Sequence, residues 1–164
     1  MYRSLVLPHL EYIVASWCPY TKADKSILEA VQMRAVRMCS TLRGKTYEDR
    51  IKEAGMLSLE EKRKRNDLAI VYQILTGKLE VDLHTWFTLT AELQEEDKRN
   101  TRHSDGYLNI VNQRPNLDVR KYSFSCRVIQ DWNSLPDTLK QARTTRSFKK
   151  QLGDWLDREE NKVR

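Results

Sequence analysis

Two stretches of the sequence carry a surplus of positively charged side chains, the residues best suited to bind a ligand. Between Arg34 and Arg65 ten lysines and arginines outnumber five acidic residues, and between Lys98 and Arg127 seven outnumber two. Such side chains neutralise nucleic-acid phosphates and release condensed counterions, which gives sequence-independent binding that weakens steeply with salt. If the two stretches faced one another, they would form a positively lined surface able to follow a duplex.

The densest positive cluster is the run from Lys62 to Arg65. In the second stretch, aromatic residues that could stack on unpaired bases lie near arginines. The aromatics are Tyr107, Tyr122 and Phe124, and the arginines are Arg102, Arg114 and Arg120. The alternative stays open, because a charged run is usually a solvated helix face and such aromatics are often core residues.

Residue patterns typical of enzymes are missing from the sequence. Polymerases and nucleases hold two metal ions between close carboxylates, but no adjacent Asp pair occurs, and the run Glu92–Asp97 reads as a solvated loop. There is no phosphate-binding GxxxxGK[ST] or GxGxxG motif and no GxSxG motif. We therefore expect no catalytic residue, no metal site, no cofactor and no small-molecule substrate. The scattered candidates are His9, His84, His103, Cys18, Cys39 and Cys126.

The composition favours a helical fold. Of the 164 residues 40% are apolar, enough for a core, whereas 5 Gly and 4 Pro are too few for a turn-rich β-sandwich. Apolar periodicity, capping residues and terminal glycines predict several helices. They cover Thr21–Arg43, Thr46–Ala54, Ser58–Thr76, Leu117–Trp132 and Thr145–Arg158. The predicted fold class is mainly α: an irregular helical domain of about five to six helices with at most one small β-hairpin.

The first two helical segments present apolar stripes. In Thr21–Arg43 the predicted buried stripe is Ile27, Leu28, Val31, Ala35, Met38, Cys39 and Leu42, with Arg34, Arg37 and Arg43 toward solvent. The segment Tyr2–Cys18 is also apolar at helical spacing and is interrupted by Pro8, which predicts a kink. Its wide stripe requires a partner.

The chain divides by composition into three segments. We expect residues 1–78 to form a thumb-like helical region, 79–116 an acidic and then basic connecting segment that is partly irregular, and 117–164 a C-terminal helical region that packs on the first, so that the three segments make one compact domain. No apolar run approaches the roughly 20 residues that span a bilayer, and no signal-peptide pattern is present. We expect no membrane partner and an intracellular location, with cytoplasm or nucleus left open.

Blocks of residues along nearly the whole chain resemble the region after the palm in reverse transcriptases of non-LTR (LINE-type, jockey-like) retrotransposons. The blocks occur in the family's order: Tyr2–Tyr12 (YRSLVLPHLEY), Leu28–Ala35 (LEAVQMRA), Tyr47–Arg50 (YEDR), Leu57–Arg63 (LSLEEKR), Thr101–His103 (TRH), Phe124–Ile129 (FSCRVI), Trp132–Pro136 (WNSLP) and Ser147–Lys149 (SFK). Thr101–His103 lacks the glycine of the family's TRGH turn.

The resemblance implies a truncated transposable-element product: the thumb and C-terminal region of an RNA-directed DNA polymerase, without the catalytic aspartates that the family carries upstream of the Tyr2 block. Such a thumb binds template RNA or an RNA–DNA duplex weakly, in a salt-dependent way, through basic helix faces. The residues expected to contact phosphates are Arg34, Arg37, Lys62, Arg63, Lys64, Arg65, Arg102 and Arg127. Arg63 and Arg127 could equally be structural salt-bridge partners, and Trp132, Leu135 and Phe148 are assigned to the core.

A second interpretation also follows from the sequence. The apolar segment Tyr2–Trp17, left bare by the missing palm, could bind a protein partner or a second copy of the chain. The protein would then be a helical interaction module with no nucleic-acid role.

Overall fold

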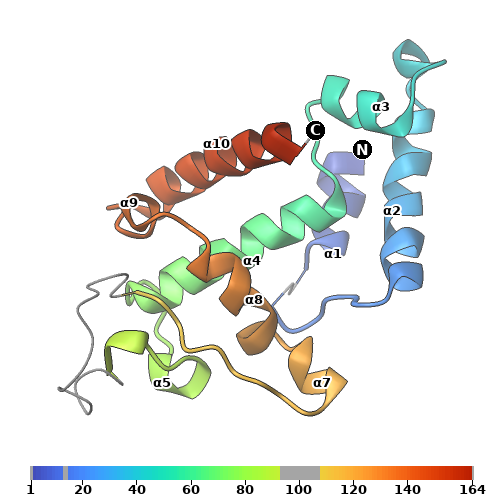
Figure 1. The fold of residues 1–164 in the computed structure, drawn as a ribbon. Coiled ribbons are helices and arrows are strands. Elements are labelled where there is room, and N and C mark those ends of the chain that lie inside the picture. Colours follow the sequence, from blue (N-terminus) through green and yellow to red (C-terminus); the bar gives the residue numbers. More distant parts are fainter. Residues whose placement is uncertain (1, 13–14, 93–107, 164) are drawn as a thin grey trace. The chain divides into compact units, whose positions relative to one another are not determined.

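The computed structural model describes residues 2–12, 15–92 and 108–163, and it is mainly helical (Figure 1). Within these ranges there is no strand, and Ile110 forms only an isolated antiparallel bridge with Leu89. The predicted mainly α fold is confirmed. The longer helices are α2 (Lys22–Arg37), α3 (Tyr47–Glu53), α4 (Leu59–Leu75), α8 (Phe124–Asn133) and α10 (Thr145–Val163). No helix in the described ranges is both long and apolar enough to cross a bilayer.

Threonine caps begin α2 and α3 as the sequence predicts. The Thr21 hydroxyl accepts a hydrogen bond from the Asp24 N–H at 3.1 Å, and the Thr46 hydroxyl accepts one from the Asp49 N–H at 3.3 Å. Each cap satisfies a backbone donor that the helix itself leaves without a partner. The carboxylates of Asp24 and Asp49 also lie at the positive end of their helix.

The long helix α4 has defined signals at both ends. Ser58 Oγ accepts from the Glu61 N–H at 3.2 Å, and the Glu61 carboxylate accepts from the Ser58 N–H at 3.0 Å, which completes a capping box. After the helix, Gly77 adopts a φ of +65°, a conformation that side chains disfavour and that commonly follows a helix end.

The chain divides into two compact units, Met1–Asn66 and Asp67–Arg164, and the boundary falls inside α4. The first half of this helix therefore belongs to one unit and the second half to the other. A helix that is shared by two cores cannot be recognised from composition. The predicted segments 1–78, 79–116 and 117–164 follow changes of charge along the chain, so their boundaries differ from the boundary between the two units.

The first unit consists of η1 (Tyr2–Val6, a π-helix), α1 (Leu7–Leu10), α2, η2 (Ser40–Leu42), α3 and the start of α4. Pro8 lies in the first turn of α1, where its missing N–H costs no hydrogen bond. Buried apolar side chains of this unit are Leu7, Val36, Leu42, Ile51 and Leu59.

The predicted buried stripe of Thr21–Arg43 is wrong for four of its members. Ile27, Val31 and Met38 are 64%, 40% and 83% exposed, and Cys39 is exposed as well, whereas the buried residues of α2 are Gln32 and Val36. Periodicity identifies an apolar face but not which face is covered. Here the covered face includes Gln32, because its amide has hydrogen-bond partners inside the unit.

The second unit has an aromatic core. The ring of Tyr72, from α4, stacks on that of Phe148, from α10, with centroids 4.3 Å apart. Trp132 lies 6.0 Å from Phe148 and donates from its indole N–H to the Leu108 carbonyl at 2.7 Å. The predicted core residues Trp132, Leu135 and Phe148 are at most 3% exposed, which confirms their assignment.

Asn133, at the end of α8, holds the segment around Ile110. Its side-chain amide donates to the Ile110 carbonyl at 2.8 Å, and its side-chain oxygen accepts from the Ile110 N–H at 3.0 Å. One side chain thus supplies the two hydrogen bonds that a neighbouring strand would supply.

Short helices complete the second unit: α5 (Leu83–Trp86), α7 (Asp118–Lys121) and α9 (Asp137–Lys140). The helix predicted over Leu117–Trp132 is two helices, α7 and α8. Ser123 separates them, because its backbone is extended (φ −63°, ψ 155°) and its hydroxyl donates to the Arg120 carbonyl.

Candidate nucleic-acid interface

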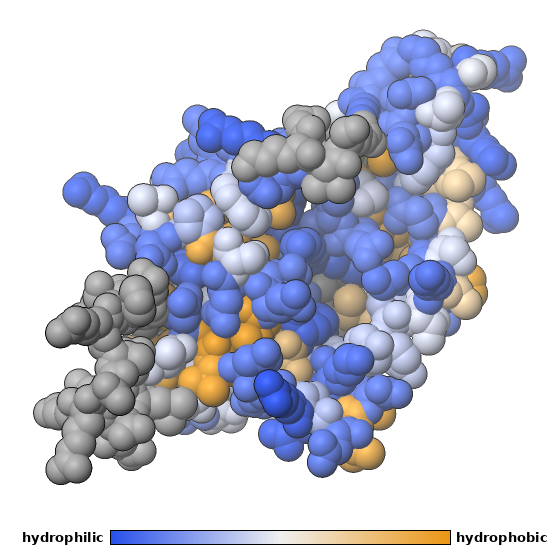
Figure 2. Space-filling view, viewed as in Figure 1, coloured by the Kyte–Doolittle hydropathy of each residue, from blue (hydrophilic) through white to orange (hydrophobic). Residues whose placement is uncertain are grey.

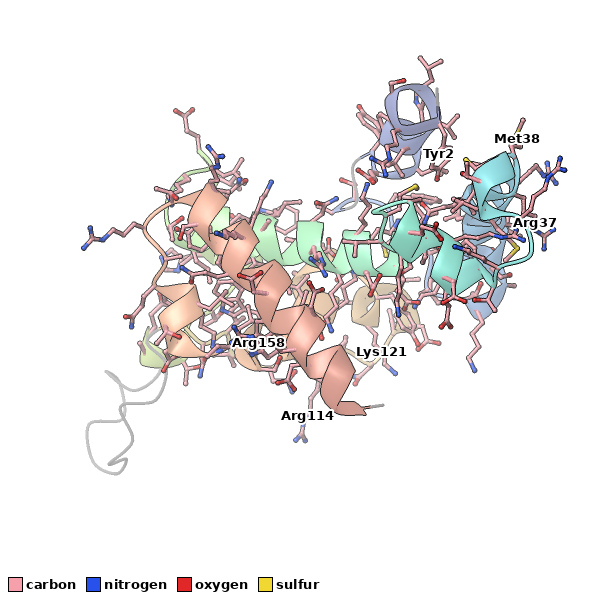
Figure 3. The ribbon with its side chains drawn as sticks, turned by 90° about the horizontal axis from the view of Figure 1, so that it is seen from above. Tyr2, Arg37, Met38, Arg114, Lys121 and Arg158 are labelled. Carbon is pink, nitrogen blue, oxygen red and sulfur yellow. The ribbon has the colours of Figure 1, made fainter. Side chains whose placement is uncertain are left out.

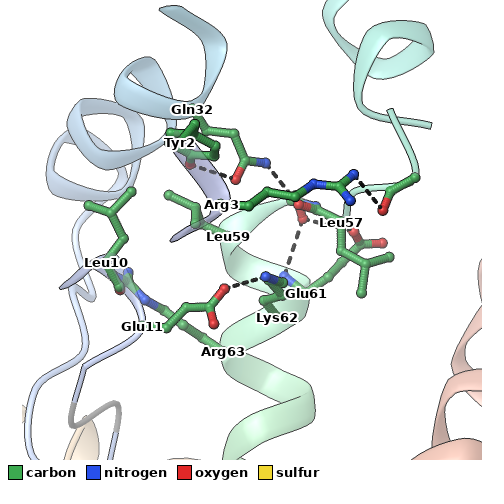
Figure 4. A network of polar contacts seen from close by, with 12 residues as sticks. Tyr2, Arg3, Leu10, Glu11, Gln32, Leu57, Leu59, Glu61, Lys62 and Arg63 are labelled. Carbon is green, nitrogen blue, oxygen red and sulfur yellow. Dashed lines mark hydrogen bonds and ion pairs between the residues drawn. The ribbon is translucent and has the colours of Figure 1, made fainter. Parts of the chain in front are cut away.

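Arg63 lies inside the first unit. Only 5% of it is exposed, and its Nη2 donates to the Leu10 carbonyl at 3.0 Å (Figure 4). Its Cζ lies 5.2 Å from the centre of the Trp17 ring. A phosphate outside the protein does not reach this guanidinium. We therefore correct the assignment: Arg63 attaches the segment around Leu10 and Trp17 to α4.

The other members of the Lys62–Arg65 run are half-buried. Lys62 forms an ion pair with Glu11 (Figure 4), and Lys64 and Arg65 each interact with other groups of the chain. The run is therefore not the fully solvated basic face that its sequence suggests, and the N-terminal segment covers Lys62 and Arg63.

Arg127, in the second unit, is also a structural residue. Its Nε and Nη2 donate to the two carboxylate oxygens of Asp67, each at 3.0 Å, and its Nη1 donates to the Tyr122 carbonyl at 3.3 Å. The paired side chains of Arg127 and Asp67 are only 17% and 10% exposed. The salt-bridge alternative is the one that the structure supports, and Arg127 is withdrawn as a phosphate contact.

Arg34 and Arg37 remain available to a ligand. Both are exposed at the C-terminal end of α2, and Arg43, just after it, is exposed as well (Figure 3 labels Arg37). We call these three residues the basic end of α2. No acidic residue occurs between Met33 and Thr46. Basic side chains in a last helical turn also complement the helix dipole, which is their structural alternative. Arg102 lies outside the described residues.

A buried polar network in the first unit accounts for several residues of the resemblance. The Tyr2 hydroxyl donates to Gln32 Oε1 at 3.0 Å, and Gln32 Nε2 donates to the Leu57 carbonyl at 2.8 Å (Figure 4). Burial, together with the charge of Glu29, raises the pKa of Tyr2 to about 12. The LEAVQMRA block therefore acts here by holding η1 and α4 against α2.

Glu29 extends this network to α3 and to the start of α4. It accepts a hydrogen bond from the Tyr47 hydroxyl through one oxygen and from the Leu59 N–H, at 3.1 Å, through the other. Burial and the bond to Glu29 raise the pKa of Tyr47. A carboxylate at the N-terminus of α4 is stabilised there by the helix dipole.

A second exposed basic site, which was not among the predicted contacts, surrounds α7. A pocket there is lined by Gln113, Arg114, Pro115, Asn116, Leu117 and Arg120. Arg114 and Arg120 are exposed, and Arg114 extends outward from the chain (Figure 3). The signal in the sequence is the pair of arginines around the break at Pro115.

The three aromatic candidates for base stacking have different environments. Phe124 is buried and lies 5.9 Å from the Trp86 ring, edge to face, so it is a core residue. Tyr122 is 36% exposed beside Lys121, whose Nζ lies 5.6 Å from its ring centre. Tyr107 lies outside the described residues.

In the described part of the chain no three His, Cys, Asp or Glu side chains lie close enough together to hold a metal ion. Comparison with known proteins gives no further guide, because no family model, no curated protein and no solved structure matches the chain.

Proposed function

We propose that this chain is the non-catalytic thumb and C-terminal region of a non-LTR retrotransposon reverse transcriptase, and that it binds template RNA or RNA–DNA duplex through the basic end of α2. The observation that carries the proposal is the exposure of Arg34, Arg37 and Arg43 in a stretch without acidic residues. The resemblance of ordered sequence blocks supports the choice of nucleic acid as ligand.

The mode of binding follows from the side chains. Arg34 and Arg37 are three residues apart on a helix, so they lie on one face and can contact neighbouring phosphates. A-form duplexes are recognised mainly by shape, 2′-hydroxyls and phosphates, so these contacts carry little sequence preference. We expect weak affinity, in the range of about 10⁻⁴ to 10⁻⁶ M at physiological salt.

The test is a fluorescence anisotropy titration of a blunt RNA–DNA hybrid at several salt concentrations. Arg34→Gln with Arg37→Gln removes two phosphate contacts, so the slope of log K against log salt becomes shallower by about 1.8. Lys22→Gln with Lys52→Gln changes the charge equally at two exposed positions of the same unit and serves as the control. Affinity that is indifferent to salt, or an equal effect of both variants, contradicts the proposal.

A protein-interaction or self-association module is the second candidate, and one observation favours it. The first unit exposes large apolar side chains, and hydrophobic residues (orange) reach the surface in Figure 2. Those in or near the N-terminal segment and α2 are Leu5, Val6, Tyr12, Trp17, Tyr20, Ile27, Val31 and Met38. Exposed apolar patches mark binding sites for proteins. Size-exclusion chromatography with light scattering distinguishes a monomer from a self-associating chain.

The proposal includes no polymerase activity, because the resemblance places the family's catalytic aspartates upstream of the Tyr2 block. Nucleotide incorporation on a primed RNA template by the purified 164-residue chain would overturn this part of it.

A further inference from the structure

The segment around α7 forms an exposed corner of the second unit. We define the α7 corner as Gln113–Leu117 with Arg120, Lys121 and Tyr122. Its pocket is lined by Gln113–Leu117 and Arg120. The backbone before α7 is irregular, and α7 itself is a single turn. Most of the corner is exposed, whereas Gln113 and Pro115 are half-buried.

The charge of the α7 corner is positive. Arg114, Arg120 and Lys121 are exposed, and among the described residues neither guanidinium has a hydrogen-bond or ion-pair partner. Asp118 is the only acidic residue between Leu108 and Gln130, and it does not line the pocket. Two guanidinium groups on one concave surface are suited to bind phosphates.

Apolar side chains lie beside this charge. Leu117 is 72% exposed and lines the pocket, and Val119 is 84% exposed. Tyr122 adds an exposed ring, with Lys121 beside it. Surfaces that combine positive charge with exposed aromatic rings bind single strands, because unpaired bases stack on the rings while phosphates contact the cations. Exposed aliphatic side chains add apolar area that a base can cover.

We propose that the α7 corner binds an unpaired stretch of RNA, with Arg114 and Arg120 on its phosphates and Leu117 and Tyr122 against its bases. The proposal deepens the proposed function and rests on it for the choice of nucleic acid. It separates two tasks: the basic end of α2 holds duplex, in which bases are stacked on one another, and the α7 corner holds the single strand. A purely acidic peptide such as polyglutamate would use the arginines but has no apolar or aromatic group to place against Leu117 and Tyr122.

The experiment measures binding of a fluorescent 12-nucleotide oligouridine by anisotropy, using the full chain. Arg114→Gln with Arg120→Gln should make the slope of log K against log salt shallower by about 1.4, because each phosphate contact on a single strand contributes about 0.7. Tyr122→Ala should weaken binding about tenfold without changing the slope, because it removes a stacking surface and no charge.

A further variant tests the apolar contact without risk to folding. Leu117 occupies the N-cap position of α7 and makes no side-chain cap there, so Leu117→Ser supplies a better cap while it removes the apolar side chain. We expect about a fivefold loss of oligouridine affinity, because the variant no longer offers apolar area for a base to cover, and unchanged or higher thermal stability.

Arg143→Gln with Arg146→Gln is the matched control, because both side chains are exposed in the same unit and the change of charge is the same. Three results would overturn the proposal: an equal effect of this control, unchanged affinity in both Leu117→Ser and Tyr122→Ala, or equal competition by a polyglutamate peptide of the same charge as the RNA.

Failure of this proposal and failure of the proposed function give different results. If only the α7 corner is misassigned, the blunt hybrid still binds and still responds to Arg34→Gln with Arg37→Gln, while the α7 variants bind oligouridine normally. If the proposed function fails, the blunt hybrid does not bind in a salt-dependent way.

Discussion

A mostly buried ion pair in the second unit joins Asp67 and Arg127. The carboxylate of Asp67 lies in a mostly buried position, and Arg127 satisfies both of its oxygens in a bidentate pair. Removing one member of such a pair leaves the other charge buried without compensation, which costs more than the intact pair contributes. The pair therefore matters to folding and not to binding.

We predict that Arg127→Met lowers the free energy of unfolding by about 3 kcal/mol, measured by urea denaturation at pH 7. The double variant Arg127→Met with Asp67→Leu should recover most of this loss, because no lone charge remains. A loss below about 1 kcal/mol in the single variant would mean that the pair behaves like a surface ion pair.

The half-buried Tyr2 makes the stability of the first unit sensitive to alkaline pH. An unfolded tyrosine loses its proton near pH 10, whereas folded Tyr2 keeps it until about pH 12. Between these values the folded state binds more protons than the unfolded state, so the free energy of unfolding falls as the pH rises.

We predict a smaller alkaline loss of stability in Tyr2→Phe than in the natural chain, measured by urea unfolding at pH 9, 10 and 11. Phenylalanine has no proton to release, so the contribution of this position no longer depends on pH. An identical fall in both proteins would show that the hydroxyl of Tyr2 is not buried against Gln32.

The structural roles of Arg63 and Arg127 could not be predicted from the sequence. Arg63 and its partner Leu10 are 53 residues apart, and Arg127 and Asp67 are 60 apart, so no local pattern links them. A run such as Lys62–Arg65 looks solvated until its neighbour in space is known. Exposure at the end of α2 was predicted correctly for Arg34 and Arg37, because charged residues off the apolar stripe stay outside.

At the scale of elements, helix ends were the most predictable feature. Caps at Thr21, Thr46 and Ser58 are local, since donor and acceptor lie within three residues, and all three are confirmed. The covered face of α2 was not predictable, because burial of Gln32 depends on Tyr2 and Leu57, far away in the sequence. The α7 pocket depends on an irregular backbone, and the only sign of it in the sequence is Pro115, which interrupts regular structure.

We predict that Ser58→Ala destabilises the protein by about 1 kcal/mol, because the N–H of Glu61 loses its acceptor at the start of α4. Thermal melting followed by circular dichroism measures the loss. Ser26→Ala, an exposed position within α2, serves as the control and should be neutral or slightly stabilising, since alanine is the better helix former. Equal melting temperatures in the two variants would mean that the capping box contributes nothing.

At the scale of the whole molecule, a net charge of +6 accompanies apolar side chains that stay at the surface. These two properties respond to salt in opposite directions. Binding to nucleic acid weakens as salt rises, because the release of condensed counterions gains less entropy when the surrounding solution already holds more salt. Association between copies of a positively charged chain strengthens, because salt screens their repulsion.

If the apolar residues of the first unit form an interface, we predict that light scattering shows more self-association at 0.5 M salt than at 0.05 M salt. The double variant Ile27→Gln with Met38→Gln should abolish this increase. Both side chains are more than 60% exposed, so these changes should leave folding intact. A monomer at both salt concentrations would remove the self-association candidate and leave the nucleic-acid proposal untouched.

The side chain of Asn133 has a consequence for how the backbone near Ile110 exchanges its protons with solvent. Opening the hydrogen bond between the Ile110 N–H and Asn133 requires the end of α8 to move, and that end is fixed by Trp132 in the aromatic core. In heavy water, the Ile110 amide should therefore exchange on the timescale of α8 opening. Amides of the irregular segment beyond Val111, whose own N–H donates to the Thr88 carbonyl at 2.9 Å, should exchange early.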